Sequence, residues 1–108
     1  MPSNLHLKDQ PTLKDIQKYV SDMMEERGFS DETALQLCLL LGEEIGELFK
    51  AVRKSENIKS DGNSNFTSIE EEIADILIYL SAIANRYDID LEKAFRNKEE
   101  LNKKREWK

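Results

Sequence analysis

The stretch LCLLLGEEIGELFKAV at residues 37–52 decides the fold, because its apolar residues recur every three or four positions. That spacing is typical of one face of an α-helix. The residues on this face are Leu37, Leu41, Ile45, Leu48 and Val52. We predict a helix of about 24 residues that is capped by Ser30 or Asp31 and ends near Lys54.

Three further helices are predicted from capping residues and apolar periods on both sides of this stretch. One covers about residues 12–27 and stops at Gly28, which can adopt the left-handed conformation of a helix end. Another covers about residues 68–86 and begins with a capping box that includes Glu71. Asp90 caps the last helix. Its inward-facing residues are expected to be Leu91, Ala94 and Phe95.

The chain of 108 residues fits a single domain, residues 1–108. It has only four Gly and two Pro, while 39% of its residues are hydrophobic and 35% are charged. This composition favours long helices over a turn-rich β architecture. We therefore predict an all-α protein with a four-helix, bundle-like architecture, a flexible tail at residues 1–11 and an exposed loop at residues 55–66.

The two central helices also carry apolar residues on a second face. These residues are Leu35, Leu39, Gly42, Gly46 and Phe49 on the first central helix, and Ile78 and Ala82 on the second. Four helices of this size cannot easily cover both faces of each central helix. We therefore expect a homo-oligomer, either a dimer or a tetramer, that buries the second faces.

Charge and hydropathy restrict the partners and the compartment. The formal net charge of -6 should repel the phosphate backbone of DNA or RNA, so polymeric nucleic acid is not an expected partner. No run of residues approaches the roughly 18 apolar residues of a membrane span, and residues 1–11 lack the apolar stretch of a signal peptide. The single cysteine, Cys38, is expected to be a buried hydrophobic residue. We therefore expect a cytoplasmic protein.

Two pairs of acidic residues interrupt the apolar faces of the central helices. Glu44 and Glu47 lie three positions apart, and so share one side of their helix. Glu72 and Asp75 repeat this spacing on the next helix. If the two helices pack antiparallel, the four carboxylates face one cavity and repel each other unless cations hold them. Oxygen ligands suit Mg²⁺ or Mn²⁺, and the only histidine, His6, lies in the tail, which disfavours zinc and di-iron sites.

Three polar residues near the C-terminus share one helical face. They are Lys98, Asn102 and Arg105, at offsets of four and seven positions from the first. Their two cations and one amide can bind phosphate oxygens. The alternative is an exposed basic terminus that interacts with the helix dipole.

The segments EEIGEL (43–48) and EEEIADIL (70–77) together resemble the Glu-x-x-Glu and Glu-x-x-Asp signature of the MazG-type all-α nucleoside triphosphate pyrophosphohydrolases. Residues 87–91, followed by Lys98, Asn102 and Arg105, are similar to the closing Lys-x-x-x-Asn-x-x-Arg segment of that family. The resemblance covers about residues 12–107. It implies a Mg²⁺-dependent enzyme that cleaves a nucleoside triphosphate to the monophosphate and pyrophosphate.

The resemblance also implies a role for each candidate residue. The metal ligands are Glu44, Glu47, Glu72 and Asp75, and either Glu44 or Glu47 accepts the proton of the attacking water. The expected role is cleaning or balancing a nucleotide pool, including deoxy or non-standard nucleotides. One alternative is a related enzyme that acts on a different pyrophosphate, such as phosphoribosyl-ATP. Another is a non-catalytic helical protein that binds nucleotide or regulates a partner, although retention of all four acidic positions argues against it.

Overall fold

In the computed structural model of this chain, which describes residues 2–56 and 68–106, all regular secondary structure is helical. The helices are α1 (Leu13–Glu26), α2 (Ala34–Ser55), α3 (Ile69–Arg86) and α4 (Leu91–Lys103). The prediction of an all-α chain with four helices is confirmed. The predicted loop lies outside the described residues from position 57 onward.

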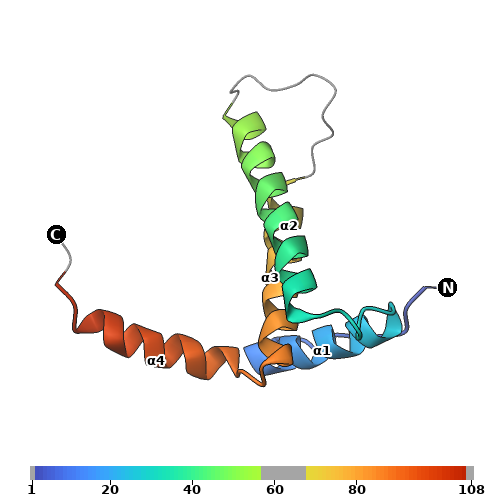
Figure 1. Cartoon of the computed structure of the whole chain (residues 1–108), viewed down its shortest axis with the longest axis horizontal. Helices are drawn as coiled ribbons and strands as arrows, with labels where there is room; N and C mark the ends of the chain where they lie inside the picture. Colours follow the sequence, from blue (N-terminus) through green and yellow to red (C-terminus); the bar gives the residue numbers. More distant parts are fainter. Residues whose placement is uncertain (1, 57–67, 107–108) are drawn as a thin grey trace.

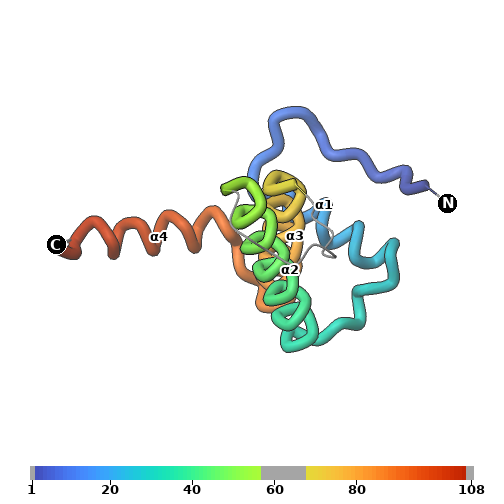
Figure 2. The backbone as a smooth tube through the Cα atoms, turned by 90° about the horizontal axis from the view of Figure 1, so that it is seen from above, coloured from blue at the N-terminus to red at the C-terminus, as the bar shows by residue number. Residues whose placement is uncertain are grey.

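The α2 and α3 helices run antiparallel and pack along each other (Figure 1). The α1 helix crosses one end of this pair and packs against α3. The α4 helix starts at the same end and projects away from α2 and α3 in both views (Figures 1 and 2). The fold therefore consists of a three-helix unit with one protruding helix.

The predicted cap of α2 is wrong. Neither Ser30 nor Asp31 begins the helix; Thr33 does, because its hydroxyl accepts the amide N–H of Gln36 while the Gln36 side chain accepts the Thr33 N–H. A Thr-x-x-Gln capping box satisfies two unpaired amides at once, which a lone Ser or Asp does not. The helix consequently starts two or three positions later than expected.

The other helix ends follow the sequence signals. Thr12, Ser68 and Asp90 each accept a backbone N–H three residues ahead and cap α1, α3 and α4. Gly28 has a φ of 80° just after α1, in the left-handed region that a residue without a Cβ tolerates.

The core lies where α1 crosses α2 and α3. Its buried apolar residues are Val20, Met23, Leu37 and Ala82. Ile78 packs against this cluster, so the prediction that Ile78 and Ala82 form an outer face of α3 is wrong. Because α1 covers that face, the opposite face of α3 remains exposed. Its exposed apolar residues are Ile73, Leu77 and Leu80.

The second face of α2 is exposed in the single chain, since Leu35, Leu39 and Phe49 are all solvent-accessible. Cys38 is exposed as well, which contradicts its predicted burial. The reason is that only one side of α2 is covered, by α3 and α1, and Cys38 lies next to Leu39 on the uncovered side.

The α4 helix has no buried residue, so the expectation that it faces inward is wrong for the single chain. Phe95 is 69% exposed and Leu101 is exposed too. Within the chain, α4 packs mainly against α1. The sequence pattern predicted burial of Phe95, but the protruding direction of α4 leaves it in solvent.

A polar clamp centred on Gln17 of α1 fixes where α4 begins. The buried Gln17 side chain donates to Asn85 Oδ1 at 3.1 Å and to the Ile89 carbonyl at 2.8 Å. The side-chain Oε1 of Gln17 accepts the N–H of Leu91, the first residue of α4, at 2.9 Å. In return, Asn85 Nδ2 donates to the Gln17 backbone carbonyl at 2.9 Å. These bonds join α1, the end of α3 and the start of α4.

The segment before α1 contacts the rest of the chain at several points, one of which is the ion pair of Lys8 with Asp15 at 3.5 Å. The Ser3 hydroxyl donates to Glu26 at 2.6 Å, and Leu5 packs against the core. The flexibility of residues 1–11 stays a prediction. No helix in the described ranges is sufficiently long and apolar to span a membrane.

Candidate active site

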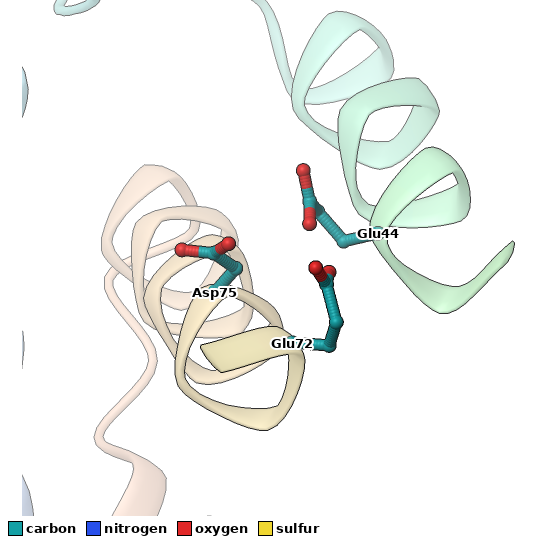
Figure 3. A group of neighbouring side chains, drawn as sticks. All are labelled: Glu44, Glu72 and Asp75. Carbon is teal, nitrogen blue, oxygen red and sulfur yellow. The ribbon is translucent and has the colours of Figure 1, made fainter. Parts of the chain in front are cut away.

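Three carboxylates converge between α2 and α3. Figure 3 shows Glu44 reaching from α2 toward Glu72 and Asp75 of α3. One oxygen from each group lies within 4.8 Å of the others. The antiparallel packing of the helices produces this arrangement, because it brings the middle of α2 to the first turns of α3. Three of the four predicted metal ligands therefore meet.

Burial makes this cluster electrostatically costly. Glu72 is only 3% exposed, and its neighbours Glu44 and Asp75 are half-buried. A carboxylate removed from water needs a hydrogen-bond donor or a positive charge close by. Among the described residues that line this cavity, Lys50 is the only cation.

This cost favours the protonated form of one carboxylate, Glu44. The pKa of Glu44 rises from 4.5 to about 7, chiefly because protonated Glu44 hydrogen-bonds to Glu72. Burial and the negative charges of Asp75, Glu72 and Glu47 raise it further. Burial, followed by the charges of Glu44 and Asp75, also raises the pKa of Tyr79. A cation in this cluster would replace the proton and relieve the repulsion.

Glu47 lies at the same cavity but outside the three-oxygen cluster. Its Oε1 is 3.4 Å from Nζ of Lys50, one turn further along α2. The cavity is open to solvent and has a volume of about 670 Å³. Its lining residues are Glu43, Glu44, Gly46, Glu47, Lys50, Glu72 and Asp75.

Sequence reasoning did not identify Lys50 and Glu43 as residues that line this cavity. The signal for Lys50 was its position three residues after Glu47, which places both side chains on one helical side.

The oxygen cluster fits a small divalent cation. In an octahedral Mg²⁺ site with bonds of about 2.1 Å, opposing oxygens lie about 4.2 Å apart. Adjacent oxygens of such a site lie about 3.0 Å apart. The three observed oxygens all lie within 4.8 Å of one another, so they are close enough to reach this spacing by movement of the side chains. The donors are all carboxylate oxygens, which suits Mg²⁺ or Mn²⁺ rather than softer metals. Glu44, Glu72 and Asp75 could hold such an ion, with Glu47 beside them.

The structure does not bring the C-terminal trio to this cluster within one chain. Lys98, Asn102 and Arg105 lie along α4 or just after it, and no residue of α4 lines the acidic cavity. Lys98 and Asn102 instead border an apolar groove of about 420 Å³ between α3, α4 and the start of α1. Leu77 and Leu80 form the α3 wall of this groove.

Comparison with known proteins agrees with this geometry. The profile of the MazG nucleotide pyrophosphohydrolase domain matches residues 32–107, which include the acidic cluster and α4. Human dCTP pyrophosphatase 1 (Homo sapiens) is 30% identical over 96% of this chain and 64% of its own length. The rat protein of the same name (Rattus norvegicus) is 30% identical over 89% of this chain and 59% of its own length.

A bacterial relative matches over a larger share of its own length. The uncharacterized protein YpjD of Bacillus subtilis (strain 168) is 38% identical over 77% of this chain and 76% of its own length. By contrast, this chain spans less than two thirds of the length of the mammalian relatives. The match of the family profile to more than half of the chain shows that this protein belongs to the MazG nucleotide pyrophosphohydrolase family.

Proposed function

We propose that this protein hydrolyses a nucleoside triphosphate to the nucleoside monophosphate and pyrophosphate in a reaction that depends on Mg²⁺. The observation that carries the proposal is the convergence of Glu44, Glu72 and Asp75 within 4.8 Å in a solvent-open cavity. Carboxylates this close to one another repel unless a cation lies between them. A triphosphate is the kind of anion that such a cation can bind to an acidic protein.

Glu44, Glu72 and Asp75 are the proposed metal ligands, with Glu47 completing the set. When bound, Mg²⁺ supplies positive charge that neutralises phosphate oxygens and makes a nearby water more acidic. The burial of Glu72 excludes solvent from the back of the site and keeps its carboxylate in one position. Asp75 follows Glu72 by three positions, so the two carboxylates are presented together from one helical side.

Glu47 is the proposed general base. It borders the cavity but lies outside the three-oxygen cluster, so its carboxylate can accept a proton from the attacking water. Its neighbour Lys50 forms an ion pair with Glu47 and adds one positive charge for the substrate. Lys98, Asn102 and Arg105 are the proposed ligands of the remaining phosphate oxygens.

Two of the relatives are named dCTP pyrophosphatase, so dCTP is the first substrate to test. We place the activity in the cleaning or balancing of a cytoplasmic nucleotide pool, with a deoxynucleotide or a non-standard nucleotide as substrate. The cavity that holds the carboxylates is open to solvent and does not by itself select a base.

The test is a pyrophosphate-release assay with ribo-, deoxy- and non-standard nucleoside triphosphates and phosphoribosyl-ATP. The full chain should release pyrophosphate and a monophosphate with Mg²⁺, and neither product in chelator. Glu72→Gln should abolish release, whereas Glu99→Gln on the exposed side of α4 should not change it. Release of orthophosphate, or binding of nucleotides without hydrolysis, contradicts the proposal.

A further inference from the structure

Lys50 places a positive charge in one part of the acidic cavity. The cavity is lined by five carboxylates, and Lys50 is the only cation among the described residues that border it. Its Nζ lies 3.4 Å from Oε1 of Glu47, and both residues are half-buried. Water screens the charges of such a pair less than those of a fully exposed pair. The ion pair therefore contributes to the electrostatics of the site.

The charged groups on α2 follow one another at intervals of three positions. Glu44 converges with Glu72 and Asp75, and one oxygen of each lies within 4.8 Å of the others. Glu47 lines the same cavity but is not part of this cluster. Lys50 comes three positions after Glu47, which advances the backbone by about 4.5 Å along the helix. The cavity therefore has two parts, which are the three-oxygen cluster and the adjacent Glu47–Lys50 pair.

One divalent cation cannot balance the charge of both parts. Glu44, Glu72 and Asp75 carry three negative charges when all are ionised, which already exceeds the two positive charges of Mg²⁺. The part that contains Glu47 therefore needs a positive charge of its own. In many sites that act on phosphate groups, a second metal ion about 3.5–4 Å from the first supplies such a charge.

Lys50 has the chemistry to supply this charge in place of a metal ion. Its ammonium group has three N–H donors on a flexible stem, so it can hold Glu47 and a phosphate oxygen at the same time. It is part of the chain, so its presence does not depend on the Mg²⁺ concentration. A Mg²⁺–oxygen bond takes about 2.1 Å, so the 3.4 Å between Nζ and Oε1 leaves no room for an ion between the two groups.

We propose that Lys50 takes the place of a second metal ion. Each chain then binds one divalent cation, at Glu44, Glu72 and Asp75, and the Lys50 ammonium group provides the further positive charge for the phosphate chain of the substrate. The role toward the substrate rests on the proposed hydrolase function. The number of ions is a property of the nucleotide-free protein and can be measured without any reaction.

Titration of the nucleotide-free full chain with Mn²⁺ counts the ions. Mn²⁺ prefers the same oxygen ligands as Mg²⁺ and is paramagnetic. In calorimetry, wild type should bind one Mn²⁺ per chain, with the electron paramagnetic resonance spectrum of an isolated ion. Lys50→Glu adds a carboxylate beside Glu47 and should bind two ions, which couple magnetically at a separation of about 4 Å. Two coupled ions in wild type, or a single ion in Lys50→Glu, overturns the proposal.

Arg53→Glu is the matched control. It makes the same change of charge on α2, at an exposed residue that does not line the cavity. This variant should bind one Mn²⁺ per chain with an uncoupled spectrum. If Arg53→Glu also binds two coupled ions, the overall charge of α2 and not the position of Lys50 sets the number of ions, and the proposal fails.

The Mg²⁺ dependence of pyrophosphate release tests the role toward the substrate. Lys50→Gln keeps a polar side chain but removes the charge, so it should raise the KM for a triphosphate about tenfold at every Mg²⁺ concentration. Lys50→Glu should be impaired at low Mg²⁺ and should recover at high Mg²⁺, because its added carboxylate binds a second ion. Wild-type kinetics in Lys50→Gln, or a Lys50→Glu variant that high Mg²⁺ does not rescue, contradicts the proposal.

The two measurements separate failure of this inference from failure of the proposed function. If wild type binds one Mn²⁺, Lys50→Glu binds two, and no triphosphate is hydrolysed, the proposed function fails while Lys50 still takes the place of an ion. If wild type hydrolyses a triphosphate but binds two coupled Mn²⁺ ions per chain, the proposed function stands and this inference fails.

Discussion

The paired helices α2 and α3 bury a carboxylate, whereas the amphipathic α4 helix buries no side chain at all. Glu72 is 3% exposed in the pair, while Phe95 on α4 is 69% exposed. This reverses the usual preference for apolar over charged residues in the interior. The single chain therefore packs α2 and α3 against each other, but it leaves every residue of α4 at least partly exposed. The acidic cluster is assembled by packing inside the chain, and α4 carries apolar residues that the chain itself leaves exposed.

The largest effect should come from Asp75→Asn, which removes one of the three carboxylates that converge between α2 and α3. Losing a charged metal ligand should lower kcat by at least about 100-fold. In chelator, the same change should raise the unfolding free energy by about 1 kcal/mol, because it removes one of the charges that strain Glu44. Pyrophosphate release and thermal melting measure the two effects.

Adding Mg²⁺ should stabilise wild type much more than the Asp75→Asn variant, so that their melting temperatures converge or cross. The control is Glu100→Gln, which removes a charge from exposed α4 and should change neither activity nor the Mg²⁺ response. If Asp75→Asn melts lower in chelator and remains active, Asp75 is a structural residue and not a ligand.

A second test removes the hydrogen bonds by which Gln17 of α1 holds the end of α3 and the start of α4. Gln17→Leu should lower the unfolding free energy by about 2–3 kcal/mol, because the Ile89 carbonyl and the Leu91 N–H lose a partly buried partner. The neighbouring change Lys18→Gln removes only an exposed ion pair with Asp22 and should cost less than about 0.5 kcal/mol. Denaturant unfolding of both variants measures the difference. Equal stabilities would mean that the clamp does not hold α4.

A third test changes Arg105, which lies just after the end of the protruding α4 helix. Arg105→Ala should raise the KM for a triphosphate about tenfold, as expected for one lost charged contact to phosphate. Mg²⁺ affinity of the nucleotide-free protein should stay unchanged, since the carboxylates that bind the ion are on other helices. Lys104→Ala is the matched control on the adjacent exposed residue. Wild-type kinetics for Arg105→Ala would support the alternative of an exposed basic terminus.

The smallest expected effect concerns pH. The folded-state pKa of Glu44 is raised from 4.5 to about 7, so the folded protein binds this proton more tightly than the unfolded chain does. The resulting stabilisation is fully present below pH 4.5 and is lost as the pH rises through about 7. In chelator, this group should therefore reduce the unfolding free energy by on the order of 1 kcal/mol between pH 5 and pH 8.

Denaturant titrations at each pH measure this loss, and Glu44→Gln should flatten the profile. Saturating Mg²⁺ should also remove the dependence, because the cation replaces the proton. A wild-type profile that is already flat in chelator would contradict the shared proton between Glu44 and Glu72.

The sequence predicted the features that depend on neighbouring residues. Caps such as Thr12 and Asp90 act within one turn, and the spacing of Glu72 and Asp75 fixes their common side whatever packs nearby. The convergence of Glu44 with them required only that consecutive helices pack antiparallel. These features were therefore predictable without knowledge of the tertiary structure.

The sequence could not indicate which face of α3 meets α1, because both faces are apolar. Ile78 is covered and Leu77 is exposed, although periodicity treats them alike. The direction of α4 was also hidden, since it depends on hydrogen bonds from Gln17 to residues more than sixty positions away. An apolar pattern predicts that a residue is buried, but it does not predict which surface covers that residue.

The long reach of the Gln17 clamp also imposes an order of events on folding. Its bonds to Ile89 and Leu91 span 72 and 74 positions, so they can form only after α1 has docked on α3. Contacts this distant in sequence close late, because a large loop must first lose its freedom. Before these bonds form, the direction of α4 relative to α1 and α3 is not fixed.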